Sequence, residues 1–91
     1  MALELSALVK GRVQGVGFRW TVMDHARAAG LAGWVRNEPD GTVRVFAQGE
    51  EEKIREFLDF LYIGPPRARV EKVASELREI DKSAIIGFNI V

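Results

Sequence analysis

Residues 3–19 read Leu3-Glu-Leu-Ser-Ala-Leu-Val-Lys-Gly-Arg-Val-Gln-Gly-Val-Gly-Phe-Arg19, and the spacing of their apolar side chains changes partway along. From Leu3 to Val9 every second residue is apolar, which predicts a half-buried strand. Beyond the glycines the apolar residues return at helical spacing, and Gly30 ends the helix that this spacing predicts. These helical positions are Phe18, Val22, Ala26 and Ala29. The local order is therefore a strand, a glycine loop and a helix.

The loop between this strand and this helix has the composition of an anion-binding site. Glycines let successive backbone N–H groups converge, and the unpaired N–H groups and dipole of a helix start favour negative charge. The stretch Gly15-Val16-Gly17-Phe18-Arg19 fits such a cradle, and the planar guanidinium of Arg19 can hold two phosphate oxygens. A Walker loop would need Gly-Lys-Ser/Thr, and a dinucleotide fingerprint would need glycine in place of Trp20. Spacing alone still favours a tight turn with a solvated arginine.

The middle of the chain predicts a hairpin followed by a second helix. A strand is expected over Leu31–Asn37, a turn over Glu38-Pro-Asp-Gly41, and a return strand over residues 42–48. The acidic run Glu50–Glu52 suits the positive end of a helix dipole, and apolar residues then repeat at helical spacing. Gly64-Pro-Pro66 cannot continue this helix.

The last third of the chain has an ambiguous pattern. The apolar residues Val70, Val73, Leu77 and Ile80 are three or four positions apart, which suits a helix as well as a strand. The tail, residues 84–91, predicts a short strand. With a strand over residues 70–79 the order is βαββαβ plus a terminal strand, which predicts an α+β ferredoxin-like sandwich: an antiparallel sheet with two helices on one face.

Composition limits the remaining choices. The 91 residues suffice for a single domain over residues 1–91. Thirteen basic and 13 acidic residues cancel, so we expect neither nucleic-acid nor membrane binding, and any anion site must be local. The absence of cysteine excludes disulfides, thiolate nucleophiles and cysteine-based metal sites. No leader pattern or long apolar run is present, and we expect a monomeric cytoplasmic protein.

Three blocks of the sequence resemble the signature segments of the acylphosphatase family. The first is Gly11-Arg-Val-Gln-Gly-Val-Gly-Phe-Arg19. The second is Gly33-Trp-Val-Arg-Asn37 followed by Asp40-Gly-Thr-Val43, and the third is Gly64-Pro-Pro-Arg-Ala-Arg-Val70. The blocks occur in the family's order and span most of the chain. One position varies in the first block, since other members carry a larger residue where this chain has Gly17.

The resemblance implies a site and an activity. A substrate phosphate would bind the backbone amides of Gly15, Val16, Gly17, Phe18 and Arg19; the Arg19 guanidinium would grip it, and the side chain of Asn37 would orient the attacking water. The implied substrate is a small-molecule acyl phosphate, a carboxyl-phosphate anhydride, which is hydrolysed to a carboxylate and inorganic phosphate without metal or cofactor. The resemblance also implies a strand over residues 70–79, and a bulge could account for its spacing.

Other functions stay open from the residues themselves. Asn37 before a Pro-Asp-Gly turn is by itself more typical of a turn former, and no side chain is an obvious general base. The rival function is a noncatalytic ferredoxin-like module that binds an anion or a small molecule. An RNA-binding version is disfavoured, because the two strands expected to expose a helix-free face would place one aromatic, Phe46, on it. A third interpretation is a domain like those in larger enzymes that handle carbamoyl phosphate.

The remaining aromatic side chains receive structural interpretations. His25 lies in the middle of the first predicted helix, about two turns from the glycine loop, and is expected at a packing boundary. Phe18, Trp20 and Trp34 are expected to be packing residues.

Overall fold

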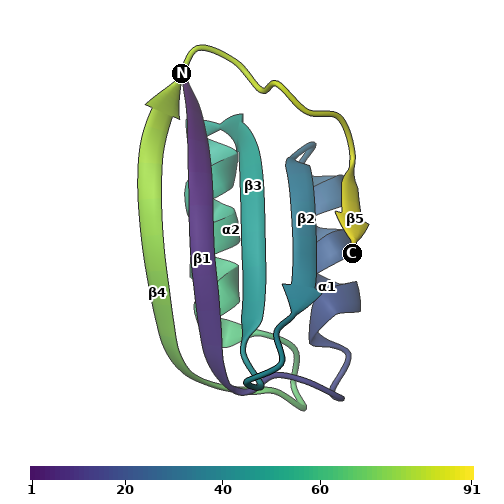
Figure 1. Ribbon diagram of the computed structural model, residues 1–91. Coiled ribbons are helices and arrows are strands. Elements are labelled where there is room, and N and C mark those ends of the chain that lie inside the picture. Colours follow the sequence, from purple (N-terminus) through teal and green to yellow (C-terminus); the bar gives the residue numbers. More distant parts are fainter.

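A computed structural model describes all residues 1–91 and contains seven regular elements (Figure 1). In chain order they are β1 (Ala2–Arg12), α1 (Phe18–Ala28), β2 (Ala32–Asn37), β3 (Val43–Glu50), α2 (Glu51–Ile63), β4 (Arg69–Ile80) and β5 (Phe88–Ile90). This is the predicted βαββαβ order with a short C-terminal strand. The strand prediction for residues 70–79 is confirmed, and β1 continues three residues beyond its predicted end at Val9.

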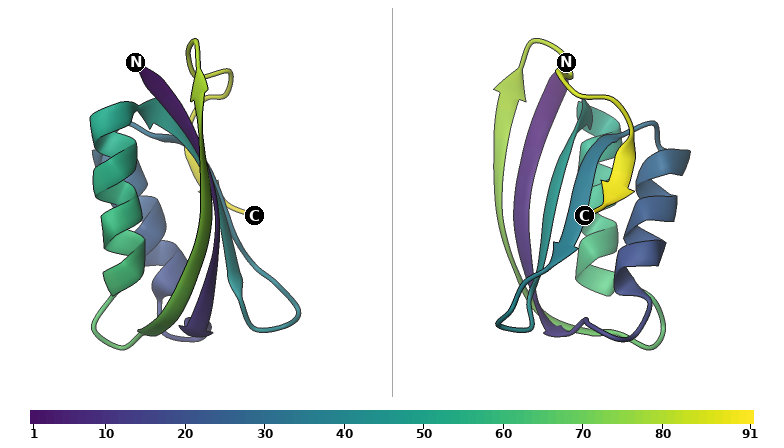
Figure 2. Two further views of the ribbon diagram at one scale, coloured as in Figure 1. Left: turned by 90° about the vertical axis from the view of Figure 1, so that its left-hand side faces the viewer. Right: turned by 45° about the vertical axis from the view of Figure 1, so that its right-hand side comes forward.

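Both helices cover the same face of the sheet, as Figure 2 shows from the side. The core lies between these two layers. Its largest fully buried side chains include Phe18 of α1, Phe57 of α2 and Phe88 of β5. The rings of Phe57 and Phe88 meet edge to face with centroids 5.9 Å apart, so the last strand is packed into the same core as the second helix.

The sheet has the strand order β4-β1-β3-β2-β5. The first four strands pair antiparallel, as predicted, but β5 pairs with β2 in parallel, with Phe88 opposite Gly33 and Ile90 opposite Val35. The sheet is therefore mixed, through the short C-terminal strand whose direction the sequence pattern did not predict. The direction follows from topology: β4 ends at the edge where β1 begins, and the connection over residues 81–87 delivers the chain to the start of β2 rather than to its end (Figure 1).

A bulge in β4 explains the ambiguous spacing of its apolar residues. The register with β1 shifts where Lys10 pairs with Lys72 but Gly11 pairs with Val70, so Glu71 has no partner. The extra residue lets Val70 and Val73, three positions apart, both pack toward the core. The bare backbone of Gly11, at φ 137°, accommodates the close approach of the Arg69 carbonyl.

The predicted packing roles are right for three of four aromatic residues. Phe18 is buried, and Trp34 is half-buried on the helix-free face, where it stacks on Phe46 with ring centroids 5.8 Å apart. His25 lies at the boundary between the helices and stacks on Phe60 at 4.5 Å. Trp20 is not a packing residue, since 62% of it is exposed. It lies on the outer surface of α1, because two positions after Phe18 it falls outside the row of Phe18, Val22 and Ala26 that the helix buries.

Candidate active site

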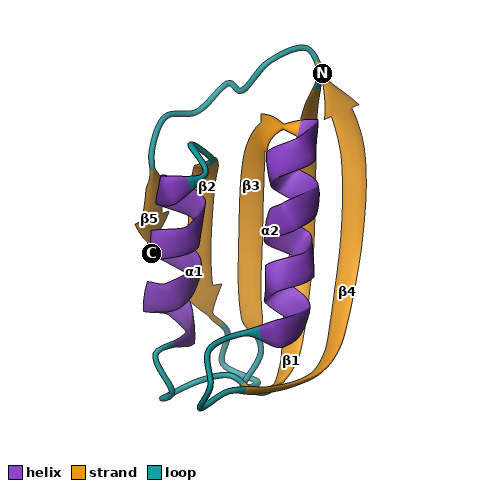
Figure 3. Ribbon diagram, turned by 180° about the vertical axis from the view of Figure 1, so that it is seen from behind, coloured by secondary structure: helices purple, strands orange, loops and turns teal.

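The chain places the glycine loop and the end of β2 at one edge of the sheet. β1 and β2 run in the same direction because each is antiparallel to β3, and both end at this edge. Val9, Val43 and Asn37 form one row across β1, β3 and β2. The loop that follows β1 and the start of α1 lie near the ends of β1 and β2, as seen from behind in Figure 3. Two of the sequence blocks that are far apart in the chain therefore meet here.

The glycine loop is anchored by its apolar side chains and exposes its backbone. Val13, Val16 and Phe18 are buried in the core, whereas Gly15 and Gly17 are exposed. Both glycines have positive φ, 74° and 78°, a conformation that other residues rarely adopt. Along the loop, buried side chains thus alternate with exposed glycines, at which the backbone itself meets the solvent.

The glycine loop leaves a set of backbone donors unused. No hydrogen bond outside the regular elements, and no side-chain bond, uses the backbone N–H groups from Gly15 to Arg19. Gly17 provides no side-chain cap, and the first turn of α1 has no acidic residue. The start of α1 therefore has its dipole and free N–H groups available to an anion.

Arg19 adds a full positive charge to these donors. It lies in the first turn of α1, is half-buried, and takes part in none of the side-chain hydrogen bonds or ion pairs of the protein. An unpaired guanidinium beside free amides is suited to a phosphoryl group, whose oxygens accept hydrogen bonds from both.

Asn37 presents a buried polar atom to the same edge. It follows the buried Val35 by two positions, so its side chain lies on the helix-covered face of the sheet. Its Oδ1 atom is buried and has no hydrogen-bond partner in the chain, a condition it shares only with Nδ1 of His25. A buried polar atom without a hydrogen-bond partner destabilises the fold, so Oδ1 of Asn37 is expected to accept a hydrogen bond from a bound water or ligand.

Gln14 joins the two halves of this site. Its side-chain Nε2 donates to the carbonyl oxygens of Glu38, at 2.8 Å, and of Thr42, at 2.9 Å. The glycine loop is thus fastened to both ends of the turn that follows Asn37. Sequence reasoning missed Gln14, although it lies within the first quoted block, because spacing carries no information about a partner 24 residues away.

The turn itself is stabilised by its own side chains. The Thr42 hydroxyl and N–H both donate to Oδ1 of Asp40, at 2.6 and 3.0 Å, and these two bonds lower the pKa of Asp40 below its usual value. Arg36 donates to the Glu38 carboxylate at 2.7 Å, and Arg44 lies 3.8 Å from it. The side chains of the turn that follows Asn37 are therefore hydrogen-bonded or ion-paired to residues of the same hairpin.

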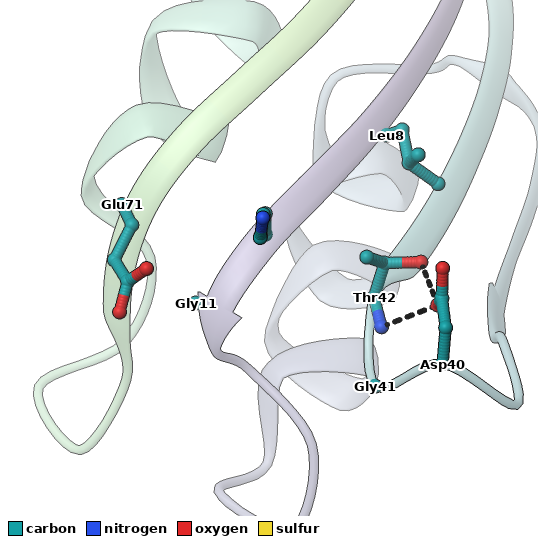
Figure 4. Close-up of a pocket in the computed structure, with 7 residues that line it drawn as sticks. Leu8, Gly11, Asp40, Gly41, Thr42 and Glu71 are labelled. Carbon is teal, nitrogen blue, oxygen red and sulfur yellow. Dashed lines mark hydrogen bonds between the residues drawn. The ribbon is translucent and has the colours of Figure 1, made fainter.

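The pocket with the greatest volume lies away from this candidate site. About 530 Å³ in volume, it is on the helix-free face and is lined by Lys10, Asp40, Thr42 and Glu71 among others (Figure 4). Figure 4 shows the Asp40 carboxylate turned to Thr42, and the hollow contains neither Arg19 nor Asn37. Its acidic groups do not converge, and nowhere do three His, Asp or Glu side chains come together as a metal site would require.

Neither helix has the length and apolar character needed to cross a membrane.

The fold and the site together define a class. The chain is a ferredoxin-like α+β domain that presents a loop of free backbone amides, an unpaired arginine and an unsatisfied asparagine at one edge of its sheet.

Comparison with known proteins identifies the family. The Acylphosphatase family model matches residues 5–90, and the chain belongs to this family. It is 49% identical over 84 residues to an acylphosphatase of Pseudomonas paraeruginosa, an alignment that covers 92% of this chain and 90% of that protein. The crystal structure of acylphosphatase from Bacillus subtilis superposes with a TM-score of 0.90 at 37% identity and covers 98% of each chain. The predicted family, ferredoxin-like fold and class of enzyme, a hydrolase, are confirmed.

A similar domain also occurs in a longer protein. The crystal structure of full-length HypF in its phosphate- and nucleotide-bound form matches all of this chain with a TM-score of 0.86 at 28% identity. The matched part is 12% of the HypF chain. The fold is thus found both in proteins of this size and within a much larger one.

Proposed function

We propose that this member of the acylphosphatase family hydrolyses small-molecule acyl phosphates at the edge formed by the glycine loop and Asn37. In this proposal the backbone amides from Gly15 to Arg19 and the Arg19 guanidinium bind the phosphoryl group. Asn37 holds the attacking water. The observation that carries the proposal is the pairing of unused cationic and amide donors with a buried asparagine oxygen that has no partner.

The roles follow from the chemistry of each group. An acyl phosphate is an activated anhydride, so the reaction mainly needs a positioned water and stabilisation of charge on the phosphoryl oxygens. Arg19 and the loop amides are preorganised donors for that charge. The Asn37 amide can accept a hydrogen bond from water through Oδ1 and donate one to a phosphoryl oxygen through Nδ2, but it cannot remove a proton.

The proposed hydrolysis needs no side chain of the protein as a general base. The water oxygen bonds to phosphorus as the bond between phosphorus and the acyl oxygen breaks, and the carboxylate leaves. The proton of the water goes to a phosphoryl oxygen, which yields inorganic phosphate. If kcat instead depended on an enzyme group that titrates near neutrality and not on the substrate, this substrate-assisted transfer would be wrong.

The test is hydrolysis of benzoyl phosphate, with and without chelator, by the wild type, Arg19→Ala and Asn37→Ala. We expect chelator-resistant turnover by the wild type. Both variants should fold, and each should lose at least the roughly 10²- to 10³-fold that follows removal of a transition-state donor. Unchanged activity in Arg19→Ala would refute its role. No turnover by a folded wild type would favour the noncatalytic anion-binding module. Monomeric state and a cytoplasmic location stay predictions.

A further inference from the structure

A shallow groove begins at Arg19 and runs along the outside of α1. About 340 Å³ in volume, it lies between this helix and the last strand. Its lining is Arg19, Trp20, Met23, Arg27, Asn89 and Ile90. Arg19, Met23 and Arg27 are four residues apart and so lie in one row along α1, about 12 Å from first to last. The groove therefore leads away from the proposed phosphate site in one direction.

The middle of the groove is apolar. Met23 is almost fully buried, at 7% exposure, and Ile90 of β5 packs on the core, so these two side chains form the floor. Trp20 forms the rim, and 62% of it is exposed. An exposed indole next to a buried methionine offers a large flat contact that a ligand can remove from water. The Trp20 ring takes part in none of the aromatic pairs of the structure.

The far end of the groove is closed by Arg27. Its Nε donates to the Phe88 carbonyl at 2.9 Å, and its Nη2 donates to Oδ1 of Asn89 at 3.3 Å. These bonds fasten α1 to β5 across the groove. The two walls are thereby held at a fixed separation, which gives the apolar floor a defined width.

We propose that this groove binds the acyl group of the substrate, and that it selects acyl phosphates whose acyl group is flat and apolar over small ones such as acetyl phosphate. The inference rests on the proposed function, because it places the phosphoryl group on Arg19 at the near end. The acyl group then extends over Met23 and Ile90 with Trp20 against its face. Pockets of a few hundred Å³ suit ligands of this size.

The test compares benzoyl phosphate with acetyl phosphate in the wild type, Trp20→Ala and Trp20→Phe. We expect Trp20→Ala to raise KM for benzoyl phosphate and lower kcat/KM about tenfold, the upper part of the range for one aromatic contact. For acetyl phosphate kcat/KM should stay within about twofold. Trp20→Phe should restore most of the benzoyl phosphate activity. Ile90→Ala, in the floor of the groove, should reproduce the selective loss to a smaller extent.

The matched control is Tyr62→Ala, which removes a similarly exposed aromatic, 54% exposed, from the other helix and should leave both substrates unaffected. Equal loss on both substrates, or no loss on either, in a Trp20→Ala variant would overturn the acyl groove. In that case wild-type turnover of acetyl phosphate would leave the proposed function standing. Absence of turnover of both substrates by the folded wild type would overturn both proposals.

Discussion

Gln14 of the glycine loop donates its side-chain amide to the carbonyl oxygen of Glu38 across 2.8 Å, one residue beyond Asn37. A second bond reaches Thr42, so one side chain sets the distance between the amides proposed to hold phosphate and the asparagine proposed to hold water. In this proposal the Gln14 side chain contacts neither the phosphate nor the attacking water. It acts as a positioning residue.

Replacing Gln14 with methionine keeps the length of the side chain and removes both donated hydrogen bonds. We expect the free energy of unfolding to fall by about 1–3 kcal/mol, because two carbonyl groups lose a partner. We also expect kcat to fall about tenfold or more, since small misplacements of reacting groups are costly. Urea denaturation and steady-state hydrolysis of acetyl phosphate would measure the two effects. An unchanged kcat in a destabilised variant would mean that the bonds serve stability alone.

Inorganic phosphate should inhibit competitively, because it carries the same oxygens as the substrate phosphoryl group. In Arg19→Ala we expect the inhibition constant to rise about 10- to 100-fold, which corresponds to a charge-assisted hydrogen bond of about 1.5–3 kcal/mol. Arg19→Lys should recover only part of this affinity, since a lysine lacks the planar fork. Isothermal titration with phosphate provides a measurement independent of turnover. Equal affinity in the wild type and Arg19→Ala would remove Arg19 from the anion site.

Gly33 is a position where the sheet requires the absence of a side chain. A Cβ atom there would overlap the carbonyl group of Phe46, and φ is 154°. We expect Gly33→Ala to destabilise the fold by clearly more than the 1–2 kcal/mol typical of left-handed strain alone. Gly30→Ala is the matched control, because its φ is 72° and its Cβ would meet open space. Similar losses of unfolding free energy in the two variants would show that the strand relaxes around the added methyl group.

Acid should weaken the fold through Glu4. Hydrogen bonds from Arg78, first, and from Gln48 lower the pKa of Glu4 below its ordinary value of 4.5. Below that pH the unfolded chain binds a proton that the folded one still excludes, so the stabilisation is present above 4.5 and is lost as the pH falls through the folded pKa. Glu4→Gln should therefore be less stable at pH 7 and lose less on acidification.

The measurement is urea denaturation at pH 7 and pH 3. Glu79→Gln serves as the control, because Glu79 lies on β4 next to Arg78, is exposed, and takes part in no side-chain hydrogen bond or ion pair. Part of the acid dependence should persist in Glu4→Gln, since the pKa of Asp40 is lowered by Thr42 in the same sense. An acid response identical to that of the wild type would exclude Glu4 as a source.

The local elements before Gly64 were predictable because each has a clear period and a glycine or proline near its end. The direction of β5 was not, since a three-residue strand carries no sign of its partner. The interpretation of Val70 and Val73 needed the bulge at Glu71, which depends on the register with β1. The composition and periodicity of a segment describe one helix or strand at a time, whereas register and direction are properties of two paired strands.

The candidate site shows the same division. Arg19 and the glycines could be found as a local anion cradle, and Asn37 through family resemblance, but the tether through Gln14 is a contact between distant segments. Trp20 was assigned to packing as an aromatic residue, although its position two residues after Phe18 leaves it outside the apolar row of the helix. The unsatisfied Oδ1 of Asn37 is likewise a property of the assembled structure.

The parallel direction of β5 also bears on how the protein can be handled. Ile90 pairs with Val35, and Asn37 lies two residues further along β2 in the same direction, so a peptide fused after Val91 would emerge toward the glycine loop. The amino end of β1 is at the opposite edge of the sheet (Figure 1). An affinity tag or surface linkage is therefore better attached at the amino terminus, where immobilised protein would keep its loop facing the solution.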